Sequence, residues 1–279
     1  MKAKTKTPKL KFGPPTLYFL CFLCFLAGFL LSALLFQDMS GVRSHSRILE
    51  SVQENDLAMP HGETGESFVR GIPFQVLSWK PRAVYFPGFA SAEQCQNIIA
   101  RAKSELEPSS LAFRKGDTEE NTKGTRTSSG TFLRASEDKT GTVASVEEKI
   151  ARATMLPRSN GEPFNVLRYQ IGQKYDCHYD SFDPEEYGPQ SNQRIASFLL
   201  YLSDVEKGGE TMFPLENGAE MTEGFDFEKC TGLKVKPRRG DGLLFYSLLP
   251  NSTIDELSLH GSCPVIKGEK WVATKWIRV

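Results

Sequence analysis

The sequence has no excess of charge of either sign, because Lys plus Arg and Asp plus Glu both number 34 in its 279 residues. Without a basic surplus the chain lacks the feature that attracts nucleic acid, so we expect no nucleic-acid partner. No internal repeat is visible. The composition, 39% hydrophobic and 24% charged, is that of one globular domain of about 200 residues.

Cysteine is sparse and has no metal-binding spacing in the main part of the chain. Cys21 and Cys24 lie in an apolar run, and no Cys-x-x-Cys pair occurs after it. This argues against a zinc knuckle. In an oxidising compartment the other cysteines can form one or two disulfides. These cysteines are Cys95, Cys177, Cys230 and Cys263.

The only long hydrophobic run lies near the N-terminus, where residues 17–36 carry no charge. Twenty such residues can span a bilayer core of roughly 30 Å. Lysines precede the run and no acid does, which by the positive-inside rule keeps residues 1–16 in the cytosol. We predict an uncleaved transmembrane signal anchor at 17–36 in a single-pass type II protein. The alternative is a cleaved signal peptide, whose apolar core usually has about 7 to 15 residues.

The rest of the chain is then lumenal, in the endoplasmic reticulum or Golgi. Residues 37–79 are polar and weakly patterned, which predicts a stem, and we expect the folded domain at 80–279. Asn251 begins an Asn-Ser-Thr glycosylation sequon, although such triplets also occur by chance.

Two helices and several short strands are expected in the domain. Ser91 and Gln94 form a capping-box pattern before a helix ending near residue 106, and Ser145 and Glu148 repeat it before a helix ending near 156. Residues 115–129 between them are typical of a mobile loop. Strand-like runs follow at 165–170, 194–202, 232–236, 243–246 and 271–277. This order predicts an α+β fold with a double-stranded β-helix (jelly-roll) core and helices packed on one sheet.

Histidine is the scarcest residue with metal-binding chemistry, with four in the chain. His178 and Asp180 would share one face of a strand, where both can bind one metal. His-x-Asp alone is weak, since a surface His beside a solvated Asp is common. His45 and His61 fall in the stem, however, which leaves His260 as the one distant partner. Two imidazoles and one carboxylate are the facial triad of non-haem iron(II) oxygenases.

A lysine ten residues after His260 indicates a second ligand. On a strand starting there, Lys270 shares a face with Val272, Thr274 and Trp276. A lysine that points inward needs an anion, and a metal-bound dicarboxylate would supply it. The alternative is a solvent-facing lysine on an edge strand.

These motifs together resemble a known family. The order and spacing of the residues from about 85 to 279 are similar to those of prolyl 4-hydroxylases, most of all the plant type with one N-terminal span. The resemblance rests on Tyr169, His178, Asp180, the Gly208-Gly209-Glu210-Thr211 run, Gly240-Asp241, the His260-Gly261-Ser262-Cys263-Pro264-Val265 run, Lys270-Trp271 and Thr274-Lys275-Trp276.

The resemblance implies an Fe(II) site at His178, Asp180 and His260, which would be the catalytic residues. The cosubstrate would be 2-oxoglutarate, with its distal carboxylate on Lys270. Contacts to the same carboxylate are implied for two more residues, Tyr169 and Thr211. The implied reaction hydroxylates C4 of peptidyl proline and releases succinate and carbon dioxide, with L-ascorbate as the reductant that restores oxidised iron.

The resemblance also implies a groove for proline-rich peptides. Arg194, Tyr175 and Trp276 match positions near it, and the loop at 115–129 could close over a peptide. A disulfide between Cys230 and Cys263 is expected as well. Hydroxyproline-rich cell-wall glycoproteins are the implied substrates, and association with other hydroxylases is possible. Two alternatives stay open: another peptidyl hydroxylase of this chemistry, such as a lysyl hydroxylase, or a non-catalytic membrane-tethered jelly-roll binding module.

Overall fold

The computed structural model describes residues 19, 22, 25–26, 58–60, 68–219 and 229–279. The chain divides into two compact units, Met1–Arg70 and Gly71–Val279. In the first, β1 (Ala58–Pro60) pairs with β2 (Phe68–Arg70) in an antiparallel ladder. No helix among the described residues is long and apolar enough to span a bilayer. The predicted cytosolic tail and most of the predicted anchor at 17–36 lie outside the described residues.

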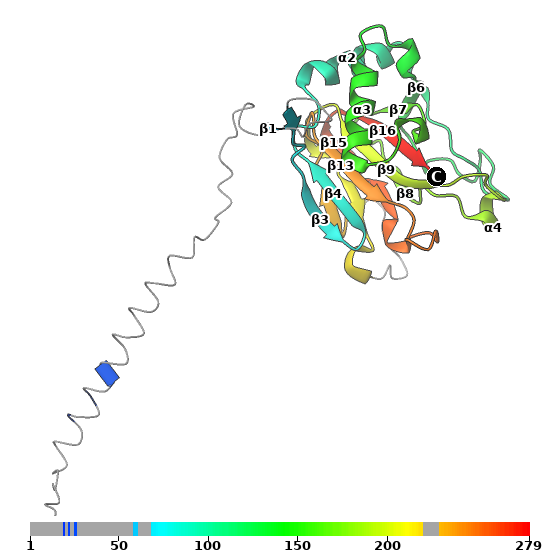
Figure 1. Cartoon of the computed structure of the whole chain (residues 1–279). Coiled ribbons are helices and arrows are strands. Elements are labelled where there is room, and N and C mark those ends of the chain that lie inside the picture. Colours follow the sequence, from blue (N-terminus) through cyan, green and yellow to red (C-terminus); the bar gives the residue numbers. More distant parts are fainter. Residues whose placement is uncertain (1–18, 20–21, 23–24, 27–57, 61–67, 220–228) are drawn as a thin grey trace, which may run out of the picture. The chain divides into compact units, whose positions relative to one another are not determined.

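The second unit is built mainly from antiparallel strands (Figure 1). The large sheet has eight strands in the order β3 (Gln75–Trp79), β4 (Arg82–Phe86), β13 (Gly242–Tyr246), β9 (Arg194–Tyr201), β16 (Lys270–Arg278), β7 (Phe164–Tyr169), β6 (Ser129–Leu133), β5 (Glu107–Pro108). The small sheet has four, in the order β12 (Leu233–Val235), β11 (Thr211–Phe213), β14 (His260–Ser262), β8 (Tyr175–His178). A separate pair joins β10 (Val205–Gly208) to β15 (Val265–Gly268).

The inner faces of the two larger sheets share one apolar core. Tyr201 and Phe245 from the large sheet pack with Phe213 from the small sheet, and the rings of Phe213 and Phe245 are 5.2 Å apart. All three side chains are buried completely. Two sheets that bury their inner faces against each other form the predicted jelly-roll core.

Helices α2 (Ala92–Lys103) and α3 (Thr142–Thr154) pack on the outer face of the large sheet, as predicted (Figure 1). The described residues also form the short helices α4 (Pro184–Tyr187), η1 (Ala135–Glu137), η2 (Arg158–Asn160), η3 (Glu216–Gly218) and η4 (Glu256–Ser258). Ile98 and Ile150 pack against Phe198 of the central strand β9. Since β9 is covered on both faces, six consecutive residues of it are buried.

The two predicted helix starts differ in outcome. Ser91 and Gln94 form the expected capping box at α2. The second prediction is wrong, because α3 begins at Thr142 and Ser145 lies within it. Asp138 accepts a hydrogen bond from the Val143 amide at 2.8 Å, so an acid upstream of the helix binds the free N–H group. The Ser-x-x-Glu spacing was therefore fortuitous.

The predicted stem is too long at its C-terminal end. The compact unit starts at Gly71, and β3 within it precedes the expected boundary at residue 79. Among the described strands, β3 forms hydrogen bonds to β4 only and is an edge strand of the large sheet. Its end residues Gln75 and Trp79 are exposed and its buried residue is the polar Ser78, so it has no strong apolar pattern that would mark it as a strand. The five predicted strand runs correspond to β7, β9, β12, β13 and β16.

Candidate functional site: a buried two-histidine, one-carboxylate cluster beside a buried lysine

The two histidines lie on neighbouring strands of the small sheet. His260 on β14 stands directly opposite His178 on β8 in the antiparallel ladder. Their ring centroids are 4.4 Å apart. Asp180 follows β8 by two residues and is 5% exposed. The strand pairing thus joins residues 82 positions apart in sequence into one cluster.

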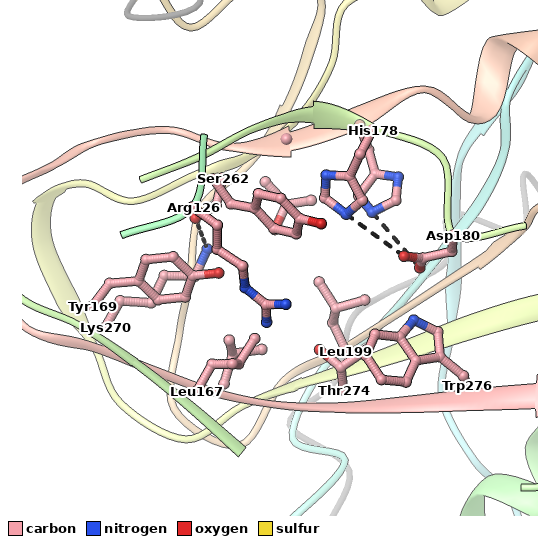
Figure 2. Close-up of a pocket in the computed structure, with 15 residues that line it drawn as sticks. Arg126, Leu167, Tyr169, His178, Asp180, Leu199, Ser262, Lys270, Thr274 and Trp276 are labelled. Carbon is pink, nitrogen blue, oxygen red and sulfur yellow. Dashed lines mark hydrogen bonds and ion pairs between the residues drawn. The ribbon is translucent and has the colours of Figure 1, made fainter. Parts of the chain in front are cut away.

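The three side chains converge on one point (Figure 2). The Nε2 atom of His178 is 3.6 Å from Oδ1 of Asp180, and Nε2 of His260 is 3.7 Å from Oδ2. One donor atom from each residue lies within 4.8 Å of the other two. This spacing suits three ligands around a single ion.

Backbone carbonyls hold both imidazoles in the orientation that a metal needs. Nδ1 of His178 lies 2.8 Å from the Asp176 carbonyl oxygen, and Nδ1 of His260 lies 3.0 Å from that of Ser258. A carbonyl only accepts, so Nδ1 carries the proton and the lone pair of Nε2 faces Asp180. Strand pairing and the local carbonyls together preset the ligands.

The protonation states agree with metal binding. Burial raises the pKa of the Asp180 carboxyl, but the charges of His260 and His178 more than offset it and hold that pKa well below its ordinary value. Burial lowers the pKa of His260 to about 4. At neutral pH the cluster therefore presents a carboxylate and a neutral imidazole, the forms that bind metals.

The donor set fits iron better than zinc. Two imidazole nitrogens and one carboxylate oxygen form the facial triad of non-haem iron(II) oxygenases, with positions left for other ligands. Structural zinc sites use four ligands. The second group that could hold a metal in the described residues contains the paired cysteines Cys230 and Cys263 with Glu210. Disulfide sulfurs are not thiolates, so the histidine cluster is the better site.

A buried lysine forms the other end of the same pocket. Lys270 is 1% exposed, and its Nζ donates to Oγ of Ser262 at 2.8 Å (Figure 2). Burial lowers the pKa of Lys270 to about 7. Among the residues that the structure describes, the ammonium group has one hydrogen-bond acceptor, the neutral Ser262 hydroxyl, which leaves donors for an incoming anion.

The predicted neighbours of this lysine are in place. The Tyr169 ring is 5.2 Å from the Lys270 ammonium, on the strand paired with β16. Thr211 lies opposite Ser262 on the adjacent strand β11 and accepts a hydrogen bond from Tyr201 at 2.9 Å. Both line the pocket with Lys270, which has polar groups at one end and the histidine cluster at the other. A short dicarboxylate can span these ends.

A wider groove of about 560 Å³ opens next to the cluster. The three residues predicted near a peptide all line it: Arg194, Tyr175 and Trp276. The Arg194 guanidinium lies 3.7 Å from the Trp276 ring and binds the Glu162 carboxylate at 2.7 and 2.9 Å. The Tyr175 ring stacks on His178 with centroids 3.7 Å apart. The groove therefore has rigid aromatic and cationic walls beside the metal ligands.

The structure contains the predicted disulfide between Cys230 and Cys263, with their Cα atoms 5.7 Å apart. Cys95 and Cys177 are free. The Cys263 amide donates to the Glu210 carbonyl at 2.9 Å. The disulfide thus ties the end of strand β14 to Cys230, while this hydrogen bond holds Cys263 next to the residue before Thr211.

Three residues in or next to the pocket were not predicted. Ser197 donates to Oδ2 of Asp180, Ser262 binds Lys270, and the Arg126 guanidinium lies 4.6 Å from the Tyr175 ring. Ser262 could have been found, because it shares a strand face with His260 two positions away. Ser197 and Arg126 are remote in sequence from their partners and carry no local signal.

The fold and the cluster define an oxygenase that uses iron(II) and 2-oxoglutarate. In agreement, residues 164–278 match the family model of the 2OG-Fe(II) oxygenase superfamily. The chain is 66% identical to Probable prolyl 4-hydroxylase 9 and 51% identical to Prolyl 4-hydroxylase 13, both from Arabidopsis thaliana, with 100% of this chain and 98% of each relative covered. The chain belongs to the prolyl 4-hydroxylase family.

A solved structure agrees with this assignment. The 2OG complex of the viral collagen prolyl hydroxylase from Paramecium Bursaria Chlorella virus-1 is 27% identical, with a TM-score of 0.50. The match covers 71% of this chain and 96% of that one.

Proposed function

We propose that this protein hydroxylates C4 of proline residues in peptides. Each turnover consumes one O₂ and one 2-oxoglutarate, and yields 4-hydroxyproline, succinate and carbon dioxide. The observation that carries this proposal is the convergence of His178, Asp180 and His260 in a pocket that ends at the buried Lys270.

Separate residues bind the metal and the cosubstrate. His178, Asp180 and His260 would hold the iron(II), which supplies the oxygen chemistry when bound. Lys270 and Ser262 bind the distal carboxylate of 2-oxoglutarate and so place its other end at the metal cluster. The pocket excludes water around the lysine, which strengthens that ion pair.

The groove binds the peptide. A proline-rich chain in the polyproline II form is ordered before binding, and aromatic walls suit its shape. Tyr175 and Trp276 line the groove beside the metal ligands, so a proline ring between them lies next to the iron site. Arg194 is held by Glu162, which keeps the Trp276 ring in a fixed position.

The test is an assay of the full-length chain with Fe(II), 2-oxoglutarate, ascorbate and a polyproline-type peptide. We expect a mass gain of one oxygen per modified proline and an equal amount of succinate. A matched peptide with lysine in place of proline separates this activity from lysyl hydroxylation. Succinate release that is absent with every peptide would favour a binding module instead.

We further propose that ascorbate supports the reaction by reducing oxidised iron. We also propose that residues 17–36 anchor the catalytic domain in the membrane, with the domain in the lumen of the endoplasmic reticulum or Golgi. Hydroxyproline-rich glycoproteins made there would be its substrates. The charge-free run with its preceding lysines supports an anchor. The disulfide supports an oxidising compartment. Asn251 is exposed in a sequon, and its Oδ1 accepts hydrogen bonds from Thr253, so it is accessible to a glycosyltransferase.

Microsomes carrying the chain test the proposed topology. Protease added outside should leave the catalytic domain intact, and glycosidase should increase the mobility of the wild type but not of Asn251→Gln. Digestion of the domain without detergent would contradict the lumenal orientation.

A further inference from the structure

The peptide groove is electrically polarised. Its lining includes Arg194 and Arg126, which lies over the Tyr175 ring beside His178, and also Glu105 and Glu107, just before and on the edge strand β5 of the large sheet. Arg101 neutralises Glu105 in an i,i+4 ion pair. Glu107, on the edge strand β5, is exposed and forms no ion pair within the part of the chain that the structure describes. One free carboxylate therefore faces the far end of the groove.

A second observation concerns a hydrogen-bond donor near the iron site that has no acceptor among the described residues. Trp276 is 8% exposed, and its indole N–H is buried without a hydrogen-bond partner among the described residues. A buried donor of this kind costs about 1–3 kcal/mol when it stays unpaired. A peptide carbonyl in the groove would satisfy it. Hence the end of the groove beside the iron ligands is built for a peptide backbone, while its far end offers a negative charge.

Strand register gives the spacing between the two ends. Glu107 lies opposite Gly130, Gly130 opposite Leu167, and Leu167 opposite Val272 on β16, the strand of Trp276. Three strand spacings of about 4.8 Å amount to about 14 Å, and the four residues from Val272 to Trp276 along β16 add about 13 Å at right angles, so Glu107 lies about 20 Å from Trp276. A polyproline II chain rises about 3.1 Å per residue, so about six residues cover this distance.

We propose that Glu107 selects substrates in which a Lys or Arg lies about six residues from the proline to be hydroxylated. This inference rests on the proposed function and adds a substrate class to it. Arg194 is paired with Glu162, and Arg126 lies over the Tyr175 ring beside the iron ligands, so Glu107 is the charged group that a substrate side chain meets at that distance.

The experiment measures kcat/KM for peptides with one target proline and Lys, Gln or Glu placed five, six or seven positions away, on either side. The wild type should favour Lys over Gln by about two- to fivefold, as expected for a solvent-accessible ion pair. The preference should disappear in Glu107→Gln and reverse toward the Glu peptide in Glu107→Lys. It should also shrink between about 0.05 and 0.5 M salt.

Glu148→Lys is the matched control, because Glu148 is exposed on α3 and does not line the groove, yet the variant changes net charge equally. This control should keep the wild-type preference. Equal kcat/KM for Lys and Gln peptides on both sides would overturn the inference while leaving proline hydroxylation intact, as would a preference that persists in Glu107→Gln. If no peptide is hydroxylated, the proposed function falls and this inference falls with it.

Discussion

Binding of 2-oxoglutarate should depend steeply on pH through Lys270. Burial lowers its pKa to about 7 in the free pocket, and the distal carboxylate of the bound cosubstrate raises it again. The complex therefore holds more protons than the free protein, so affinity is full below pH 7 and is lost as pH rises. At pH 8 about one lysine in eleven is protonated, so the apparent Kd should increase roughly tenfold between pH 6 and pH 8.

Calorimetric titration of 2-oxoglutarate into the anaerobic Fe(II) protein measures this effect. At pH 8, buffers with different ionisation enthalpies should report uptake of about 0.9 proton per ligand bound. Lys270→Met supplies the control, since it keeps the length of the side chain without its charge. That variant should bind about ten- to 150-fold more weakly at pH 6.5, as expected for loss of a charged hydrogen bond of about 1.5–3 kcal/mol.

The pH dependence of the 2-oxoglutarate affinity tests whether Lys270 causes the decline. Lys270→Met should show a flat affinity where the wild type declines. An affinity of the wild type that is constant from pH 6.5 to 8.5, or an equal decline in Lys270→Met, would refute the assigned role of the lysine.

Three further changes test the metal site and its support. Asp180→Ala should abolish tight binding of Co(II), an oxygen-stable probe for the iron site, measured by its visible absorption; wild-type affinity in the variant would remove the carboxylate from the ligand set. Ser197→Ala should weaken Co(II) binding about tenfold because the carboxylate loses its hydroxyl donor, whereas Ser197→Thr should retain it; equal affinities in both would make the serine a packing residue. Replacing Cys230 and Cys263 together by Ser should lower the free energy of unfolding by about 4 kcal/mol, as expected for loss of a cross-link that spans 33 residues. Urea denaturation measures this change. A loss below about 1 kcal/mol would contradict the loop-entropy argument.

The sequence predicts elements that have a local signal. Alternation along β16 places Lys270 and Trp276 on one face, and that face does line the pocket. The His-x-Asp spacing likewise predicts that His178 and Asp180 lie together. These inferences need only the geometry of one strand.

The scarcity of histidine pointed to His260 as a partner of His178, but the strand pairing that joins such distant segments was out of reach. The pairing of β14 with β8, which brings His260 opposite His178, depends on the whole sheet. Ser197 meets Asp180 for the same reason, since β9 belongs to the other sheet. A hydroxyl that bonds across two sheets leaves no periodic trace in either strand.

Capping patterns were reliable only where the whole motif formed. At α2 both side chains engage the backbone, whereas at α3 the Ser145 pattern lies inside the helix and Asp138 does the capping. A motif of two residues is common by chance, and the strand and turn before it decide where the helix starts.

The two faces of β16 each carry one buried lysine. Lys270 points into the pocket, and Lys275 on the opposite face donates to Glu147 of α3, with both partners over 90% buried. A shift of one residue along β16 would exchange its faces and strip both ammonium groups of their partners at once. The turn between β15 and β16 therefore cannot gain or lose a residue. Its length is dictated by electrostatics on both sides of the sheet, and natural variation in this protein should fall elsewhere.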